Sequence, residues 1–415
     1  IWPGVLSRDA ARPAPAGAGR RSWALAGLLA TLVMLGPFSI DLYLPAFGAI
    51  GAEFGVPQVA VQATLSAYLF AYAFMMLWHG ALSDALGRRP VVLAGLAVYA
   101  VATLGCAIAG NISSLWLVRA LQGLSAGSGL VVGRAIIRDR YHGAEAQKVM
   151  SQITLVFSIA PAVAPVVGGV LLNTLGWRSV FWALLAFTLG LLAWTARSLP
   201  ETHPPSARTP LHPRTMARNY RAVLGRPEFL LLALVPALNF GAFFVYVAGA
   251  QAFLVDLLGV STWGFGWLFI PLITGVMIGA TVSGRVAGRL APRRTVRIGY
   301  VFMAAAAAVN LALAAFAPAR VAIHVAPLFV FMIGSSIVMP SVTVMLLDLF
   351  PAMRGLASSL QGFIQFTLSG IIAGTVAPIL DRSLVGLASG MAAFTLASFA
   401  LWLAYLHRTR HAPPP

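Results

Sequence analysis

The stretch Gly80-Ala-Leu-Ser-Asp84-Ala-Leu-Gly87-Arg88-Arg89-Pro90 lies between two long apolar runs, at 60–82 and 91–110. Each run is long enough to cross a bilayer core of about 30 Å as a helix that rises about 1.5 Å per residue. Gly80 and Gly87 tolerate the positive φ of a tight turn, Pro90 suits the first turn of the next helix, and arginines stay on the cytoplasmic side. The stretch therefore predicts a very short cytoplasmic turn between two spanning helices.

The composition is that of an integral membrane protein. Hydrophobic residues make up 59% of the 415 residues and charged residues only 9%, which is too few to cover a soluble domain. The net charge of +17 would suggest a nucleic-acid partner for a soluble chain. Here 27 of the 28 basic residues are arginines, and most of the basic residues fall in alternate loops, so we interpret the charge as setting the topology and expect no nucleic acid.

Apolar length, with breaks at charged residues, glycine and proline, predicts twelve spanning helices. A proline-rich polar stretch separates six of them from the other six. We therefore expect an all-α integral membrane protein with an N-terminal tail at 1–21, a six-helix half at 22–200, a cytoplasmic linker at 201–228, a second six-helix half at 229–406 and a tail at 407–415. The predicted spans are 24–46, 60–82, 91–110, 113–136, 148–172, 178–198, 229–250, 264–287, 296–316, 322–347, 355–378 and 384–406.

The distribution of basic residues predicts the topology. With the N-terminus inside, 24 basic residues fall on the cytoplasmic side, against three, Arg178, Arg320 and Arg382, on the other side. Both termini are therefore predicted to be cytoplasmic. The stretch 284–294 repeats the opening motif 204 residues later, with Gly288 in the place of Asp84. Two related halves are typical of transporters whose substrate site lies between them near the bilayer midplane.

Asp41 and Arg119 are charged residues inside predicted spans. Each lies about 8–9 Å from the outer end of its helix, so the two share a depth. A carboxylate there is costly unless it is paired, hydrated or protonated, and we interpret Asp41 as the proton-binding site and Arg119 as the cation that modulates it. The two either pair directly or alternate. The alternatives are that Asp41 reaches the outer interface and that Arg119 only anchors helix packing.

Further residues are expected to form a bending helix and a substrate cavity. Pro161 and Pro165 remove two hydrogen bonds from one helix face, and Gly168 and Gly169 let a neighbouring helix approach closely. Gln122, three residues after Arg119, shares its face and is expected to contact the cavity. Aromatic side chains in the seventh span either wall the cavity or face lipid. The cavity set is Tyr43, Gln122, Phe240 and Phe244.

Several motifs resemble a known family. The opening stretch resembles the loop signature of the major facilitator superfamily, and Arg119-Ala-Leu-Gln122-Gly123 resembles its fourth-helix motif, which has a part in proton coupling. The segment from Pro161 to Gly169 resembles the fifth-helix signature of its antiporters, without that signature's first glycine. With Asp41-Leu-Tyr43-Leu-Pro45, Pro200-Glu201-Thr202 and the run from Gly355 to Gly362, the chain is similar to the Bcr/CflA branch of the drug:proton antiporters from Asp41 to about Gly362.

This resemblance implies a twelve-helix exporter of small, often hydrophobic, drug-like compounds in a bacterial inner membrane. It implies antiport against protons by alternating access, with helices one, four, seven and ten facing the cavity. No nucleotide-binding loop, metal cluster or nucleophilic triad is found in the sequence, so we expect no enzyme activity, metal or cofactor. We expect a monomer in the lipid bilayer. The alternatives are an exporter of a metabolite such as an amino acid or sugar, and a non-transporting membrane sensor.

The same template suggests a conformational latch at the cytoplasmic face. Asp84 is expected to approach the N-terminus of the eleventh helix near Gly355–Ser358, where the helix dipole favours an anion, and to hold the two halves together in the outward-facing state. Arg88 is expected to pair with Asp139 or Glu201. The whole latch set is Gly80, Asp84, Gly87, Arg88, Arg89, Asp139 and Glu201.

Overall fold

The computed structural model describes residues 18–141 and 143–410, and every regular element in these residues is helical. Eleven helices are long and apolar enough to cross a membrane, and α6 contains a shorter apolar stretch, Ile159–Leu175. The predicted all-α membrane fold is therefore confirmed. Of the two predicted tails, residues 1–17 and 411–415 lie outside the described residues.

The described residues of the first half form seven helices, because an additional short helix, α2, follows the first predicted span. Helix α1 ends at Asp41, and a short 3₁₀ turn over Leu44–Ala46 with Pro45 at its start redirects the chain into α2. The helices are α1 (Ala18–Asp41), α2 (Phe47–Phe54), α3 (Gln58–Leu86), α4 (Arg88–Ala107), α5 (Ile112–Arg140), α6 (Gly143–Leu175) and α7 (Arg178–Ser198).

The second half begins after a linker that contains a helix which the sequence interpretation missed, α8 (Pro213–Leu224). Pi-helical segments at Ala252–Leu257 and Ile372–Val376 follow α9 and α13. The helices of this half are α9 (Pro227–Ala248), α10 (Gly266–Val286), α11 (Pro292–Phe316), α12 (Val321–Asp348), α13 (Arg354–Ile371), α14 (Ala377–Leu380) and α15 (Leu384–Arg410).

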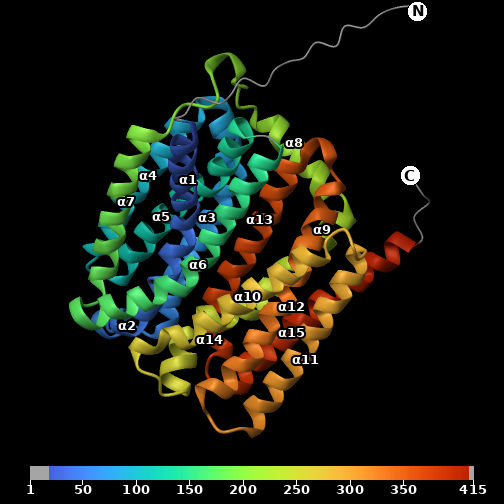
Figure 1. Cartoon of the computed structure of the whole chain (residues 1–415). Helices are drawn as coiled ribbons and strands as arrows, with labels where there is room; N and C mark the ends of the chain where they lie inside the picture. Colours follow the sequence, from blue (N-terminus) through green and yellow to red (C-terminus); the bar gives the residue numbers. More distant parts are fainter. Residues whose placement is uncertain (1–17, 142, 411–415) are drawn as a thin grey trace, which may run out of the picture.

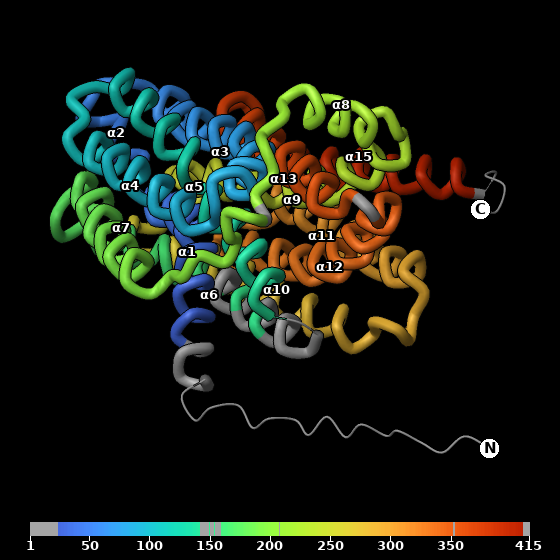
Figure 2. Tube along the Cα trace, turned by 90° about the horizontal axis from the view of Figure 1, so that it is seen from above, coloured from blue at the N-terminus to red at the C-terminus, as the bar shows by residue number. Residues whose placement is uncertain are grey.

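The two halves lie side by side, as the blue-to-green and yellow-to-red parts of Figure 1 show. They meet along two seams, α3 against α13 and α6 against α10. Figure 2 shows α8 lying over the second half, above α9 and α13. We call the end of the molecule with α8 and the turn at Gly87 the arginine-rich end, and the end with α2 the opposite end.

The predicted turn between the second and third spans is confirmed and is only one residue long. Gly87, with φ of 103°, separates α3 from α4, and Pro90 lies in the first turn of α4. Gly80 was wrongly predicted to be a turn residue. It lies inside α3, where a Cβ atom would meet only a Val131 methyl group at 3.8 Å, so neither its backbone nor its packing requires glycine.

Helix α5 is the centre of the first half and packs directly on the backbones of α1 and α3. A Cβ atom on Gly123 would lie 2.2 Å from the Tyr68 carbonyl oxygen, and one on Gly129 would lie 2.3 Å from the Leu32 carbonyl oxygen. Small residues therefore let these helices approach more closely than any side chain would allow.

We predict that Gly123→Ala destabilises the protein by about 1–3 kcal/mol or more, because the added methyl group meets a backbone oxygen that cannot move aside. The matched control is Gly190→Ala on α7, where a Cβ atom meets nothing within 4 Å. Removing a helix-interior glycine there should leave stability unchanged or raised by roughly 0.5–1 kcal/mol. Melting temperatures in detergent test both, and equal shifts for the two variants would contradict the packing described.

Candidate functional site

Arg119 lies fully buried in the centre of the first half. Its Nη1 atom donates to Ser39 Oγ at 3.3 Å and to Gln122 Oε1 at 2.5 Å. The guanidinium carbon lies 4.6 Å from the centre of the Tyr43 ring and 4.5 Å from that of Tyr68. Its Nε and Nη2 atoms have no hydrogen-bond partner among the described residues. A permanent cation is thus held by two aromatic faces and two neutral oxygens.

Gln122 and Tyr43 belong to this buried cluster rather than to a cavity wall. Gln122 accepts from Arg119 and donates to Thr103 Oγ1 of α4 at 2.7 Å, and its side chain is fully buried. Tyr43 is also fully buried, and its hydroxyl lies 2.8 Å from Thr64 Oγ1 of α3. Both residues were predicted to contact the substrate cavity. In this structure they do not, because their polar groups are taken by neighbouring helices of the same half.

Asp41 lies beside this cluster without joining it. Arg119 contacts Ser39 and Tyr43, two residues before and two residues after Asp41, yet no ion pair or hydrogen bond of the Asp41 carboxyl group is found in the described part of the chain. Residues two apart on a helix point in roughly opposite directions. The direct pairing with Arg119 is therefore absent from this conformation. Asp41 is 6% exposed.

The aromatic residues of α9 pack on one another. The rings of Phe240 and Phe244 stack with centres 5.4 Å apart, and Phe243 meets Phe240 edge-on at 4.7 Å. Phe244 is buried, whereas Phe240 is partly exposed. Gly241, between them, faces Ile372 and Leu368 of the α13 segment. This aromatic group therefore lies where α9 approaches α13, and its part in substrate binding stays a prediction.

The two glycines of α6 fit against two different neighbours. A Cβ atom on Gly168 would lie 2.2 Å from the Leu42 carbonyl oxygen, in the first half. One on Gly169 would lie 2.7 Å from the Thr262 carbonyl oxygen, in the second half. Pro165 lies about one turn and Pro161 about two turns before them in the same helix. Helix α6 therefore joins the halves at the opposite end through direct backbone approach.

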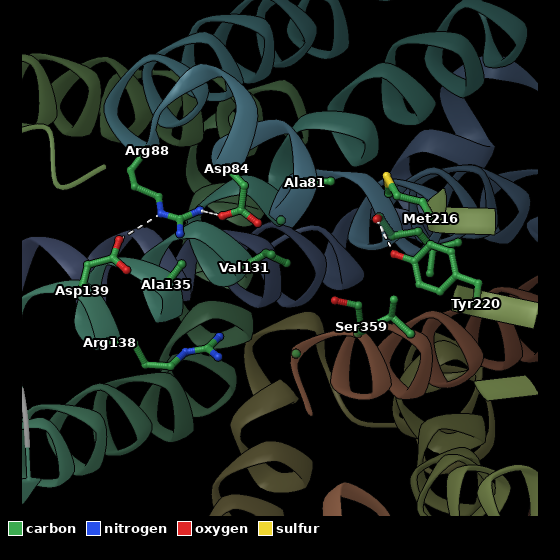
Figure 3. Close-up of a pocket in the computed structure, with 14 residues that line it drawn as sticks. Ala81, Asp84, Arg88, Val131, Ala135, Arg138, Asp139, Met216, Tyr220 and Ser359 are labelled. Carbon is green, nitrogen blue, oxygen red and sulfur yellow. Dashed lines mark hydrogen bonds and ion pairs between the residues drawn. The ribbon is translucent and has the colours of Figure 1, made fainter. Parts of the chain in front are cut away.

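At the arginine-rich end the halves enclose a cleft of about 370 Å³. Figure 3 shows Asp84, Arg88, Arg138 and Asp139 on the first-half side, with Ser359 of α13 facing them. Helix α8 closes one side, where the Tyr220 hydroxyl donates to the Leu77 carbonyl oxygen at 2.6 Å. The sequence interpretation missed this contact, because it took 201–228 as an irregular linker.

Arg88 holds the acidic residues of the latch set together. It is buried, and it donates to Asp84 Oδ1 at 2.5 Å and to Asp139 Oδ2 at 3.0 Å. Asp84 faces Gly355 and Ser359 across the cleft, and no hydrogen bond to α13 is found for it among the described residues. In this conformation the Asp84 charge is therefore satisfied within the first half.

Glu201 holds the N-terminus of α4. Its carboxylate accepts from the backbone N–H groups of Arg88 at 3.0 Å and Arg89 at 3.2 Å. Burial acts to raise the pKa of Glu201, but the backbone N–H groups of His203, Arg88, Arg89 and Thr202 favour the carboxylate, and the pKa is lowered overall. Gly87 is required beside it, since a Cβ atom there would lie 2.6 Å from Glu201 Oε2.

Comparison with known proteins identifies the family. The family model described as Major Facilitator Superfamily matches residues 27–374. The chain belongs to the major facilitator superfamily. It is a multi-pass membrane transporter rather than an enzyme, and the resemblance to the Bcr/CflA branch is confirmed by its relatives.

The sequences of two curated relatives align with most of this chain. It is 30% identical to the bicyclomycin resistance protein homolog of Haemophilus influenzae, over 84% of this chain and 87% of that protein. It is 29% identical to multidrug resistance protein D of Escherichia coli K12, over 94% and 97%. Among solved structures, the D-xylose-proton symporter matches with a TM-score of 0.70 at 17% identity, over 92% of this chain and 97% of that chain. That match shows the shared fold.

We predict that Glu201→Gln lowers the melting temperature at neutral pH and flattens its dependence on pH. A carboxyl group whose pKa is lower in the folded state stabilises the protein above its unfolded pKa, and this contribution is lost as the pH falls. Thermal melts across the acidic range test this. The control Glu228→Gln removes a partly exposed carboxylate that pairs with Arg408 at 3.4 Å and should lower the neutral-pH melting temperature less. A Glu201→Gln profile parallel to that of the wild type would contradict the capping role.

Proposed function

We propose that this transporter exports small, hydrophobic, drug-like molecules from the bacterial cytoplasm in exchange for protons, by alternating access. The observation that carries the proposal is the Asp41 carboxyl group, buried in α1 with no described partner and next to residues that contact a permanent cation. A group in this setting changes charge readily when water or a ligand reaches it. The names of the two curated relatives, which speak of bicyclomycin and multidrug resistance, support drugs as the substrate class.

The arrangement of the halves supports the mechanism. The opposite end is closed by the backbone contact of Gly169 with Thr262, and the arginine-rich end holds the cleft. We place the arginine-rich end in the cytoplasm, because arginine-rich loops are retained there. The cleft is then the route by which a cytoplasmic molecule enters. The proton gradient is the driving force, no cofactor takes part, and one chain is the working unit.

We predict that Asp41→Asn abolishes drug-dependent proton movement. Inside-out vesicles with an acidified lumen are supplied with a panel of structurally unrelated drugs, and the lumenal pH is recorded. The wild type should raise the lumenal pH when a substrate is added, whereas Asp41→Asn should not, because it has no proton to exchange.

The matched control for this assay is Asp348→Asn, which removes an exposed carboxylate paired with Arg354 at 2.9 Å and should retain activity. A response that survives in Asp41→Asn places the proton site elsewhere. A wild type that responds to no drug but to an amino acid or sugar is a metabolite exporter, and a wild type that responds to nothing fits a sensor.

For Asp84 we propose a latch in the outward-facing state, when the cleft closes and Asp84 meets the N-terminus of α13 near Gly355. Its position across the cleft from Gly355 and Ser359 supports this. We predict that Asp84→Asn leaves expression intact and lowers transport several-fold. Asp139→Asn is the comparison, because Asp139 also binds Arg88. Equal losses in both variants would mean that Asp84 only positions Arg88, and unchanged transport in Asp84→Asn would rule out the latch.

A further inference from the structure

A hydrogen bond between side chains of the two halves closes the opposite end. Gln62, in the second turn of α3, donates through Nε2 to Asp381 Oδ2 at 2.7 Å. Asp381 directly follows α14 in the second half. The same Nε2 atom lies 3.5 Å from the carbonyl oxygen of Ala248, the last residue of α9. Gln62 is 1% exposed and Asp381 9%, so this contact is largely buried.

The other contacts between the halves at this end use neutral groups. Thr262 Oγ1 donates to Asn173 Oδ1 at 2.7 Å, and the Gln251 amide lies against Gly48. Among the hydrogen bonds that join the halves here, within the described residues, the one from Gln62 has an ionisable acceptor. The charge of Asp381 can therefore alter how firmly this end is closed.

Charged groups on both sides of Asp381 tune its proton affinity. Burial, and to a smaller extent the Asp256 carboxylate, raise the pKa of Asp381. The hydrogen bond from Gln62 and the Arg382 guanidinium lower this pKa, but the net result is a raised pKa. The backbone of Gly249 also packs against Asp381, since a Cβ atom on Gly249 would lie 3.1 Å from the Asp381 Cβ atom. Asp381 therefore keeps its proton to a higher pH than an exposed aspartate does.

We propose that Gln62 and Asp381 form the gate at the opposite end and that protonation of Asp381 opens it. A hydrogen bond to a carboxylate is roughly twice as strong as one to a neutral acceptor, so protonation weakens the link between the halves. The proposal rests on the alternating-access exporter above, in which this end faces the side that supplies protons. A low external pH then favours the outward-facing conformation, in which Asp41 can bind a proton and the drug can dissociate.

The test measures the conformation directly, without transport. Spin labels are attached at Gly110→Cys and Ala319→Cys, on outer loops of the two halves, and their separation is measured by double electron–electron resonance in nanodiscs. Gly110 has room for a side chain, since a Cβ atom there meets nothing within 4 Å, and the native Cys106 is fully buried and stays unlabelled. All variants carry Asp41→Asn, so that titration of Asp41 makes no contribution.

With Asp381 intact, the long-distance population should rise as the pH falls. Asp381→Asn, which mimics the protonated acid, should show that population raised roughly five- to tenfold at neutral pH and without pH dependence. Asp256→Asn should move the midpoint to lower pH, because it removes a charge that favours protonation of Asp381. A midpoint that stays or moves upward in Asp256→Asn overturns the proposal, as does a pH response that survives in Asp381→Asn.

Gln62→Leu tests the hydrogen bond itself. It removes the donor and should open the gate at every pH, and adding Asp381→Asn should then have no further effect. Additive effects of the two changes would show that Asp381 acts through another partner and would contradict the proposal. Transport is assayed separately with protein that keeps Asp41. If that protein exports drugs but the Asp41→Asn background shows no pH-dependent distances, the gate alone is refuted, whereas pH-dependent distances in that background and no transport by the Asp41-containing protein refute the exporter function.

Discussion

The buried guanidinium of Arg119 is the constraint on which the first half depends. A charge without a paired carboxylate in a protein interior costs several kcal/mol. Each aromatic face returns about 0.5–2 kcal/mol and each hydrogen bond to the cation about 1.5–3 kcal/mol. Two tyrosine rings, Ser39 and Gln122 together offset this cost, and they come from α1, the turn that follows it, α3 and α5. The glycines of α5 follow from this, since they bring the backbones of α1 and α3 close enough to surround the charge.

This arrangement gives Asp41 its setting. Ser39 and Tyr43 are held against Arg119, so the segment between them is fixed and Asp41 points away from the cation. The carboxyl group is buried beside the cluster without being locked in an ion pair with Arg119. Helix α6 packs beside it through Gly168 on the Leu42 carbonyl oxygen, and its next residue, Gly169, contacts the second half. Helix α6 thus links the backbone next to Asp41 with the second half at the opposite end.

The sequence was most informative where a residue type has one physical use. The positive φ of Gly87 and the position of Pro90 in the first turn of α4 were predictable for this reason. The family resemblance suggested Asp139 or Glu201 as the partner of Arg88, and the structure shows the side-chain ion pair with Asp139. Apolar length likewise predicted the spanning helices. The depth of a residue in a predicted span does not tell in which direction around the helix its side chain points. The sequence could therefore place Asp41 and Arg119 at a similar depth but could not decide whether they pair.

The features that the sequence did not predict depend mostly on contacts with residues far away in the chain. Gln122 was taken as a cavity residue because nothing in the sequence connects it with Thr103. Helix α8 was missed because prolines dominate 201–228, although 214–226 lacks proline and Met216, Tyr220 and Val223 recur at helical spacing. The contact of Gln62 with Asp381 joins residues 319 apart, a separation at which no local pattern is informative.

The central claim is that Asp41 carries the proton that is exchanged for substrate. Its most direct test is to add a transported drug to purified protein in unbuffered solution and to measure proton release alongside drug binding. The account predicts that the wild type releases protons in proportion to the drug bound and that Asp41→Asn binds drug without releasing any. Equal proton release from the two proteins would contradict it.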